Sequence, residues 1–245
     1  MRRAILASAL AGCLAGGGAA AGAVASVAPA PRVPMMVAGR AHVLGGPRTV
    51  VARATTVPAS GHRCAVGAGT PLAALAALRR AGGPGFHVRD FGGCSARSPA
   101  ASESLYVDRI GPDRARGADG WVYKVGRRAP GVGAGSPGIR ARAGQPVLWF
   151  YCHMGAGGCQ RTLALTASAA RVTAGAPVQL TVRGYDDRGR GVAVAGAQVT
   201  LGAATATTGA DGGATLTAPA SRGRYRATAT ATGLVPAFPV EVTVT

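Results

Sequence analysis

Five cysteines are the residues of this 245-residue sequence most able to do covalent chemistry. Cys13 falls in an apolar N-terminal stretch, which leaves an even number for the rest of the chain. In an exported protein such cysteines predict disulfides, and four of them allow three pairings. We predict Cys64–Cys94, which flank an expected helix and its return loop, and Cys152–Cys159, which enclose a glycine-rich loop.

The chain offers few ligands for a metal ion. A zinc site could use Cys152, His153 and Cys159, but this set lacks a C-x-x-C knuckle and a fourth ligand. The aspartates that could bind calcium are Asp186, Asp187 and Asp211. Turn capping explains them more simply, because calcium needs more converging oxygens. We therefore predict no metal site.

No arrangement of residues typical of an enzyme is present. The sequence has nine acidic residues and four histidines, and no two carboxylates form an evident acid–base couple. Ser136 lies in a segment that half matches a nucleophile elbow, but Pro137 would obstruct the helix that must follow. We predict a protein without catalysis, and a secreted hydrolase is the weakest alternative.

The N-terminus has the pattern of an export signal over residues 1–25. Arg2 and Arg3 precede an apolar, small-residue stretch without acidic residues, and Ala23-Val24-Ala25 offers a cleavage site before Ser26. The alternative is a lipoprotein, because Leu10-Ala11-Gly12-Cys13 matches a lipobox and would anchor the chain through lipidated Cys13. Either route places the protein outside the cell or in the cell envelope.

The net charge of +18 comes almost wholly from arginine, and Lys124 is the only lysine. Codon usage in a GC-rich genome produces this excess of arginine, alanine, glycine and proline. The arginines are scattered in pairs rather than clustered, whereas specific polyanion binding needs clustered charge. We therefore predict no specific nucleic-acid partner.

The elements that must position these residues are mainly strands, with one main helix. We expect a linker or edge segment at residues 26–48, and a disulfide-linked α+β domain at residues 49–161. Within that domain, residues 49–57 alternate and are rich in β-branched side chains, which predicts a strand. Further alternating or apolar runs predict strands at residues 86–89, 104–110, 120–125 and 147–152.

The helix is predicted over residues 70–80. Thr70 is a favourable N-cap and Pro71 suits the first turn. Leu72, Leu75 and Leu78 then lie on one helical face, which must face the core.

Four aromatic residues alternate on two of the predicted strands: Trp121, Tyr123, Trp149 and Tyr151. Only 4% of the chain is aromatic, so the core needs these side chains. We favour core packing, and ligand stacking is the alternative use.

The same region resembles a known family. The runs that carry the resemblance are G-W-V-Y-K-V-G at 120–126, G-V-G-A-G at 131–135 and A-G-Q-P-V-L-W-F-Y at 143–151. They resemble bacterial domain-of-unknown-function family 4430, which is similar to the C-terminal domain of transcobalamin and intrinsic factor. The resemblance covers about residues 49–152 and implies a compact β-grasp-like or transcobalamin-like α+β domain. It also implies that a corrinoid such as cobalamin is a candidate ligand. Gly126-Arg127 and Gln145 depart from the family pattern.

Residues 162–245 contain no cysteine and predict an immunoglobulin-like β-sandwich. Short alternating runs recur, such as residues 178–183 and 240–244, with turn signals between them. Residues 197–227 resemble bacterial immunoglobulin-like and carboxypeptidase-regulatory-like modules. The whole sequence thus predicts an exported interaction protein that binds a small molecule, a glycan or a surface protein.

Overall fold

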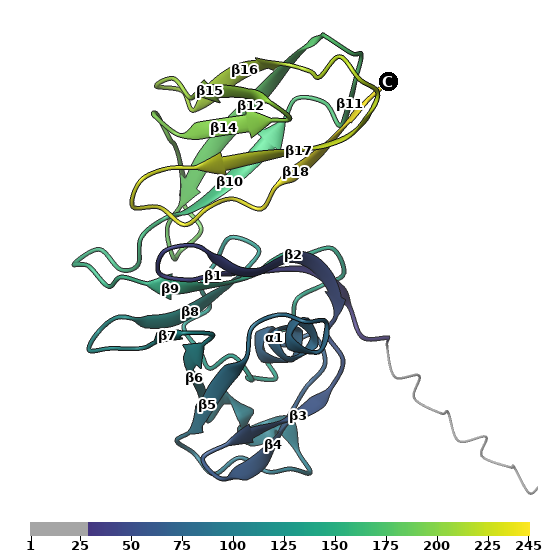
Figure 1. Cartoon of the computed structure of the whole chain (residues 1–245). Coiled ribbons are helices and arrows are strands. Elements are labelled where there is room, and N and C mark those ends of the chain that lie inside the picture. Colours follow the sequence, from purple (N-terminus) through teal and green to yellow (C-terminus); the bar gives the residue numbers. More distant parts are fainter. Residues whose placement is uncertain (1–28) are drawn as a thin grey trace, which may run out of the picture.

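The structure is a computed structural model that describes residues 29–245. It is mainly β, with α1 as its main helix (Figure 1). The expected signal peptide and Cys13 lie outside the described residues. Within the described part, no helix combines the length and the apolarity needed to cross a membrane. The chain forms a helix-containing first domain and a second domain made only of strands.

The first domain is built on a four-stranded sheet in the order β2 (Val43–Val51), β1 (Arg32–Ala38), β9 (Val147–Cys152), β8 (Gly120–Val125). β1 pairs with β9 in parallel, and the other pairs are antiparallel. Residues 32–38, which we expected to belong to a linker or edge segment, form β1, an internal strand of this sheet, whereas β2 lies at its edge. The run Val33-Pro34-Met35-Met36-Val37 is continuously apolar, which is typical of a strand buried on both faces.

The two faces of this sheet enter two different cores. Met35 and Trp149 point into the core of the first domain. Met36 and Phe150, one residue later on each strand, point into a smaller core that also contains Val235 of the second domain. The sheet is thus covered on one side by α1 and on the other by the second domain (Figure 1).

Helix α1 (Pro71–Arg80) confirms the predicted helix. The Thr70 hydroxyl accepts a hydrogen bond from the Ala73 amide at 3.2 Å, which caps the first turn. Leu72, Leu75 and Leu78 are fully buried against the sheet. Burying three such side chains contributes roughly 1.5–3 kcal/mol each.

The rest of the first domain consists of two small sheets. One is the hairpin β3 (Thr55–Ala59) and β4 (His62–Val66). The other contains β5 (Phe86–Asp90), β6 (Leu105–Ile110) and β7 (Asp113–Arg114), and the 3-10 helix η1 (Pro99–Ser104) leads into β6. The strand predicted over residues 49–57 is split, since β2 ends at Val51 and β3 begins at Thr55.

The second domain is a two-sheet sandwich, as predicted. The first sheet contains β10 (Thr162–Ala167), β12 (Pro177–Tyr185), β13 (Gly191–Ala193) and β16 (Gly213–Thr217). The second has the order β11 (Arg171–Val172), β18 (Val240–Val244), β17 (Gly223–Thr230), β14 (Gln198–Leu201), β15 (Ala204–Thr207). Alternate residues such as Leu180 and Val199 fill the space between the sheets.

Both predicted disulfides are present. Cys64 in β4 is bonded to Cys94 in the loop after β5, and Cys152 at the end of β9 is bonded to Cys159. Disulfides of this kind indicate an oxidising environment.

Candidate functional site

One cavity of the described residues lies beside strand β8, mostly in the first domain. Its volume is about 500 Å³, which is within the range of sites for small molecules. One wall is formed by β8 and the start of β6, and the opposite wall by the loop at residues 129–134. The lining is mostly apolar.

Three of the four aromatic residues singled out in the sequence line this cavity. Trp121 and Tyr123 come from β8 and Trp149 from β9, directly opposite Tyr123 in the sheet register. Tyr151 does not line it; its ring packs edge-on against Trp121 at 5.7 Å, inside the core. Since Trp121, Tyr123 and Trp149 are also almost fully buried, they serve as core and as cavity wall together.

The polar side-chain atoms of Trp121, Tyr123 and Trp149 are already hydrogen-bonded to the protein. The Trp121 Nε1 donates to the Asp113 carbonyl at 2.9 Å, and the Trp149 Nε1 donates to the Pro71 carbonyl at 3.2 Å. The Tyr123 hydroxyl donates to the Val132 carbonyl at 2.7 Å, and burial raises the pKa of Tyr123 to about 12. The wall therefore offers a ligand mainly apolar ring surface.

The rim of the cavity carries exposed apolar side chains that the sequence analysis missed. Tyr106, Val132 and Met154 are three of the six large hydrophobic side chains exposed in residues 29–245, and all three line this cavity. A fourth, Phe91, packs against Tyr106 with ring centroids 6.4 Å apart. The sequence gives no signal for this gathering, because the four residues come from separate loops and strands.

The loop that forms the outer wall needs glycine. A side chain at Gly133 would collide with the carbonyl of Glu103, the residue before the end of η1. Gly135 lies similarly close to the Ser102 carbonyl. These close approaches hold residues 129–134 against η1 and so fix the width of the cavity.

The charged end of the cavity lies at the junction of the two domains. Asp187 lines the cavity, and its Oδ2 accepts a hydrogen bond from the Cys159 amide at 3.1 Å. Its Oδ1 is 3.6 Å from the Nζ of Lys124, a residue with 0% exposure. Burial lowers the pKa of Lys124, and the charge of Asp187 opposes part of that effect.

Lys124 reaches from β8 into the second domain. Its Nζ donates to the carbonyls of Tyr185 and Asp186, both at 2.9 Å, and to the Thr162 hydroxyl at 3.2 Å. Lys124 therefore links the first domain to the end of β12 through hydrogen bonds.

Two of the three aspartates considered for calcium cap turns. Asp186 Oδ1 accepts from the Arg190 amide at 2.8 Å, and Asp211 Oδ1 accepts from the Gly213 amide at 2.9 Å. Asp187 is engaged by Cys159 and Lys124, as described above. Asp186 and Asp211 thus have the local partners expected for turn residues, whereas the partners of Asp187 come from other segments of the chain.

The residues considered for zinc binding and for nucleophilic catalysis have other partners or are buried. Cys152 and Cys159 are bonded to each other, while His153 Nδ1 lies 3.3 Å from an Asp119 carboxylate oxygen. Ser136 is buried, and none of the histidines, all of which lie in the described part of the chain, is hydrogen-bonded to it.

A second histidine–aspartate pair lies on the β5–β6 sheet. The buried Asp108 carboxylate accepts hydrogen bonds from His87 Nδ1 and from Arg89 Nε, the latter at 2.9 Å. Burial alone would raise the pKa of Asp108, but the hydrogen bonds and charges of His87 and Arg89 outweigh it and lower that pKa.

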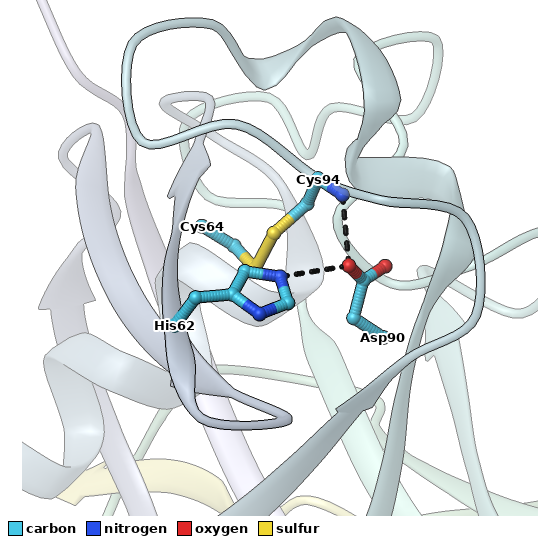
Figure 2. Close-up of side chains that lie close together, drawn as sticks. All are labelled: His62, Cys64, Asp90 and Cys94. Carbon is cyan, nitrogen blue, oxygen red and sulfur yellow. Dashed lines mark hydrogen bonds and ion pairs between the residues drawn. A yellow bond between two sulfur atoms is a disulfide. The ribbon is translucent and has the colours of Figure 1, made fainter.

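One group of metal-ligating side chains does converge in residues 29–245, and its members are not among the residues that line the cavity. It lies at the β3–β4 hairpin and comprises His62, Cys64, Asp90 and Cys94 (Figure 2). The two cysteines were predicted to form a disulfide, whereas no sequence pattern relates His62 or Asp90 to them.

Comparisons with known proteins place the chain in no family. No protein-family model matches it, and no curated protein matches it. The class defined by the fold is therefore a two-domain, disulfide-containing, mainly β protein.

Proposed function

We propose that this chain is an exported, non-enzymatic binding protein that holds a small, largely apolar ligand in the cavity beside β8. The observation that carries the proposal is the gathering of Tyr106, Val132 and Met154 on the rim of a cavity with an aromatic wall. Soluble monomers rarely expose contiguous apolar patches larger than a few hundred Å², and such patches often mark binding sites. Concave sites lined by aromatic groups with a few polar ones are the usual form of a ligand site.

The second domain contributes to the same site rather than only extending from it. Asp187 of the second domain closes one end of the cavity and is tied to the first domain by Lys124. Asp187 and Glu103 are the two acidic residues of a lining that is mostly apolar. We therefore expect ligands with an apolar body and a hydrogen-bond donor or cationic group that contacts Asp187.

Support for export is indirect. The two disulfides fit an oxidising compartment, and the N-terminal residues have the pattern of a signal peptide. Cleavage before Ser26 would release the protein, whereas lipidation of Cys13 would tether it. Mass spectrometry of the protein purified from its host distinguishes the two mature N-termini.

Binding can be tested through the tryptophans, because both tryptophans of the chain line the cavity. We would titrate the full chain with N-phenyl-1-naphthylamine, a neutral apolar probe, and record tryptophan quenching together with probe emission. A probe in the cavity must quench Trp121 and Trp149, whereas a probe on the second domain need not.

Matched variants locate the binding. Val132→Asp places a charge on the rim, and Val192→Asp makes the same change on the second domain; the two valines are 44% and 46% exposed. We expect Val132→Asp to weaken probe binding at least tenfold and Val192→Asp to leave it unchanged. Equal affinities for the two variants, or no binding by the unmodified chain, would refute the proposal. Cobalamin, titrated in the same way and followed by its own absorbance, tests the ligand implied by the resemblance.

A further inference from the structure

The β3–β4 hairpin and the end of β5 bring four metal-ligating side chains together (Figure 2). His62 begins β4, and Cys64 follows two residues later on the same side of the strand. Asp90 ends β5, and Cys94 lies four residues later, in the loop that turns back over the hairpin. The ligand atoms of all four residues lie within 4.8 Å of one another.

The Asp90 carboxylate is held in a fixed orientation. Its Oδ1 accepts hydrogen bonds from the Ser104 hydroxyl at 2.8 Å and the Gly92 amide at 3.1 Å. Its Oδ2 faces His62 Nε2 at 2.9 Å and also accepts from the Cys94 amide at 2.8 Å. Carboxylates that ligate metal ions are typically held in orientation by hydrogen bonds of this kind. Oδ2 is thus the oxygen directed at the histidine and the sulfurs.

We propose that, when the Cys64–Cys94 disulfide is reduced, these four side chains form a tetrahedral zinc site. Two sulfurs, one imidazole nitrogen and one carboxylate oxygen form a set that zinc accepts in proteins. Bond lengths of about 2.0–2.3 Å place the ligand atoms of such a site roughly 3.3–3.8 Å apart. The sulfurs must therefore move apart from bonding distance, and the His62–Asp90 contact must lengthen by about half an ångström.

The chemistry of the switch balances with a phosphine as reductant. The phosphine takes the oxygen of one water molecule and becomes a phosphine oxide. Its two electrons and the two water protons convert the Cys64–Cys94 bond into two thiols. Zinc then binds both sulfurs as thiolates and releases their two protons to solvent.

The burial pattern suits a metal that enters from solvent. Cys64 and the Asp90 side chain are buried, whereas the His62 side chain is 46% exposed and covers the outer side of the cluster. A rotation of His62 opens a path to the other three ligands. The same corner of the domain would thus be linked by a covalent bond when oxidised and by a metal ion when reduced.

The test uses a variant in which only one pair of cysteines remains. In the full chain carrying Cys13→Ser, Cys152→Ser and Cys159→Ser, we would reduce Cys64–Cys94 with tris(2-carboxyethyl)phosphine and titrate with Co²⁺. We expect one Co²⁺ per chain, with the visible bands of tetrahedral Co²⁺ and near-ultraviolet thiolate charge transfer, both removed by Zn²⁺. The unreduced protein should show neither signal.

A matched histidine pair separates a ligand from a bystander. His87 is as exposed as His62, with a 44% exposed side chain, and it also contacts a buried aspartate. Loss of an outer partner of a metal site costs 10–100-fold in affinity, so loss of a direct ligand should cost at least about tenfold. We therefore expect His62→Ala to weaken Zn²⁺ binding by at least that factor and His87→Ala to leave it unchanged.

Two results would overturn the proposal: no Co²⁺ spectrum in the reduced protein, or equal affinities in the two histidine variants. If the reduced protein unfolds without metal, circular dichroism shows whether Zn²⁺ refolds it. Refolding on addition of Zn²⁺ that requires His62 supports the site. A chain that stays unfolded in Zn²⁺ argues against it.

Discussion

Replacing Lys124 with methionine is the sharpest test of how the two domains are joined. Methionine keeps most of the length and volume of the lysine stem but removes the ammonium group. That group donates three hydrogen bonds to Thr162, Tyr185 and Asp186, and it lies 3.6 Å from Asp187 Oδ1. The variant therefore leaves two carbonyls, one hydroxyl and one carboxylate without their partner.

The expected loss follows from those partners. Hydrogen bonds to a charged group contribute about 1.5–3 kcal/mol each. Part of their sum is offset, because the variant no longer has the desolvation cost of a buried ammonium group. Removing one member of a fully buried charged pair typically costs about 3–5 kcal/mol, but the Asp187 side chain is 32% exposed, so solvent compensates part of the loss and about 2–3 kcal/mol remains. We expect Lys124→Met to lower the free energy of unfolding by that amount.

Urea unfolding measures the loss, because urea does not screen charge. Both tryptophans lie in the first domain, so their fluorescence follows that domain, while circular dichroism follows both. The control is Arg188→Met, which removes one exposed positive charge from the turn after β12 and should change stability by less than about 0.5 kcal/mol.

A double-mutant cycle assigns the effect to the pair. Asp187→Asn should cost less in the Lys124→Met background than in the unmodified chain, because the charge it removes has already lost its partner. The reasoning is wrong if Lys124→Met costs under about 1 kcal/mol, or if it costs no more than Arg188→Met.

Three further predictions concern the first domain. Replacing Cys64 and Cys94 with serine should lower the free energy of unfolding by about 3–4 kcal/mol in urea, from a loop that spans 30 residues; an unchanged midpoint contradicts this. Gly133→Ala should cost about 1–3 kcal/mol and weaken probe binding, whereas Gly157→Ala, which has open space around it, should do neither. Asp108→Asn should cost about 1–3 kcal/mol at neutral pH. Because the folded-state pKa of Asp108 is lowered, its contribution is present above pH 3.8 and is lost as the pH falls toward the folded pKa. The difference between the variant and the unmodified chain should therefore shrink in unfolding curves recorded below pH 3.8, and a constant difference would contradict the assignment.

The local features of the fold were predictable because they depend on neighbours in the sequence. Thr70, Pro71 and the spacing of three leucines are sufficient to define α1. The disulfide pairs followed from spacing, and alternation identified the strands of the sandwich. β1 was missed because Val33-Pro34-Met35-Met36-Val37 does not alternate. A strand buried on both faces loses the period-two pattern by which a strand is recognised.

The site was less predictable because it depends on contacts between distant segments. Alternation on two strands identified the aromatic residues of the wall. It did not show that they line a cavity in addition to packing in the core. The rim joins Tyr106, Val132 and Met154, and no local pattern relates these positions. The same holds for His62 and Asp90, which are 28 residues apart and meet only because β5 ends beside the β3–β4 hairpin.

Strand β8 connects these observations. Trp121 and Tyr123 point into the first-domain core and the cavity, whereas Lys124, on the opposite face, points into the second domain. Alternation along one strand thus places the cavity wall and the domain contact back to back. Asp187 connects the cavity with the domain contact, because it lines the cavity and also forms an ion pair with Lys124. A ligand that contacts Asp187 must therefore act on the carboxylate that compensates the buried lysine, so occupancy of the cavity and the strength of the domain junction are energetically linked.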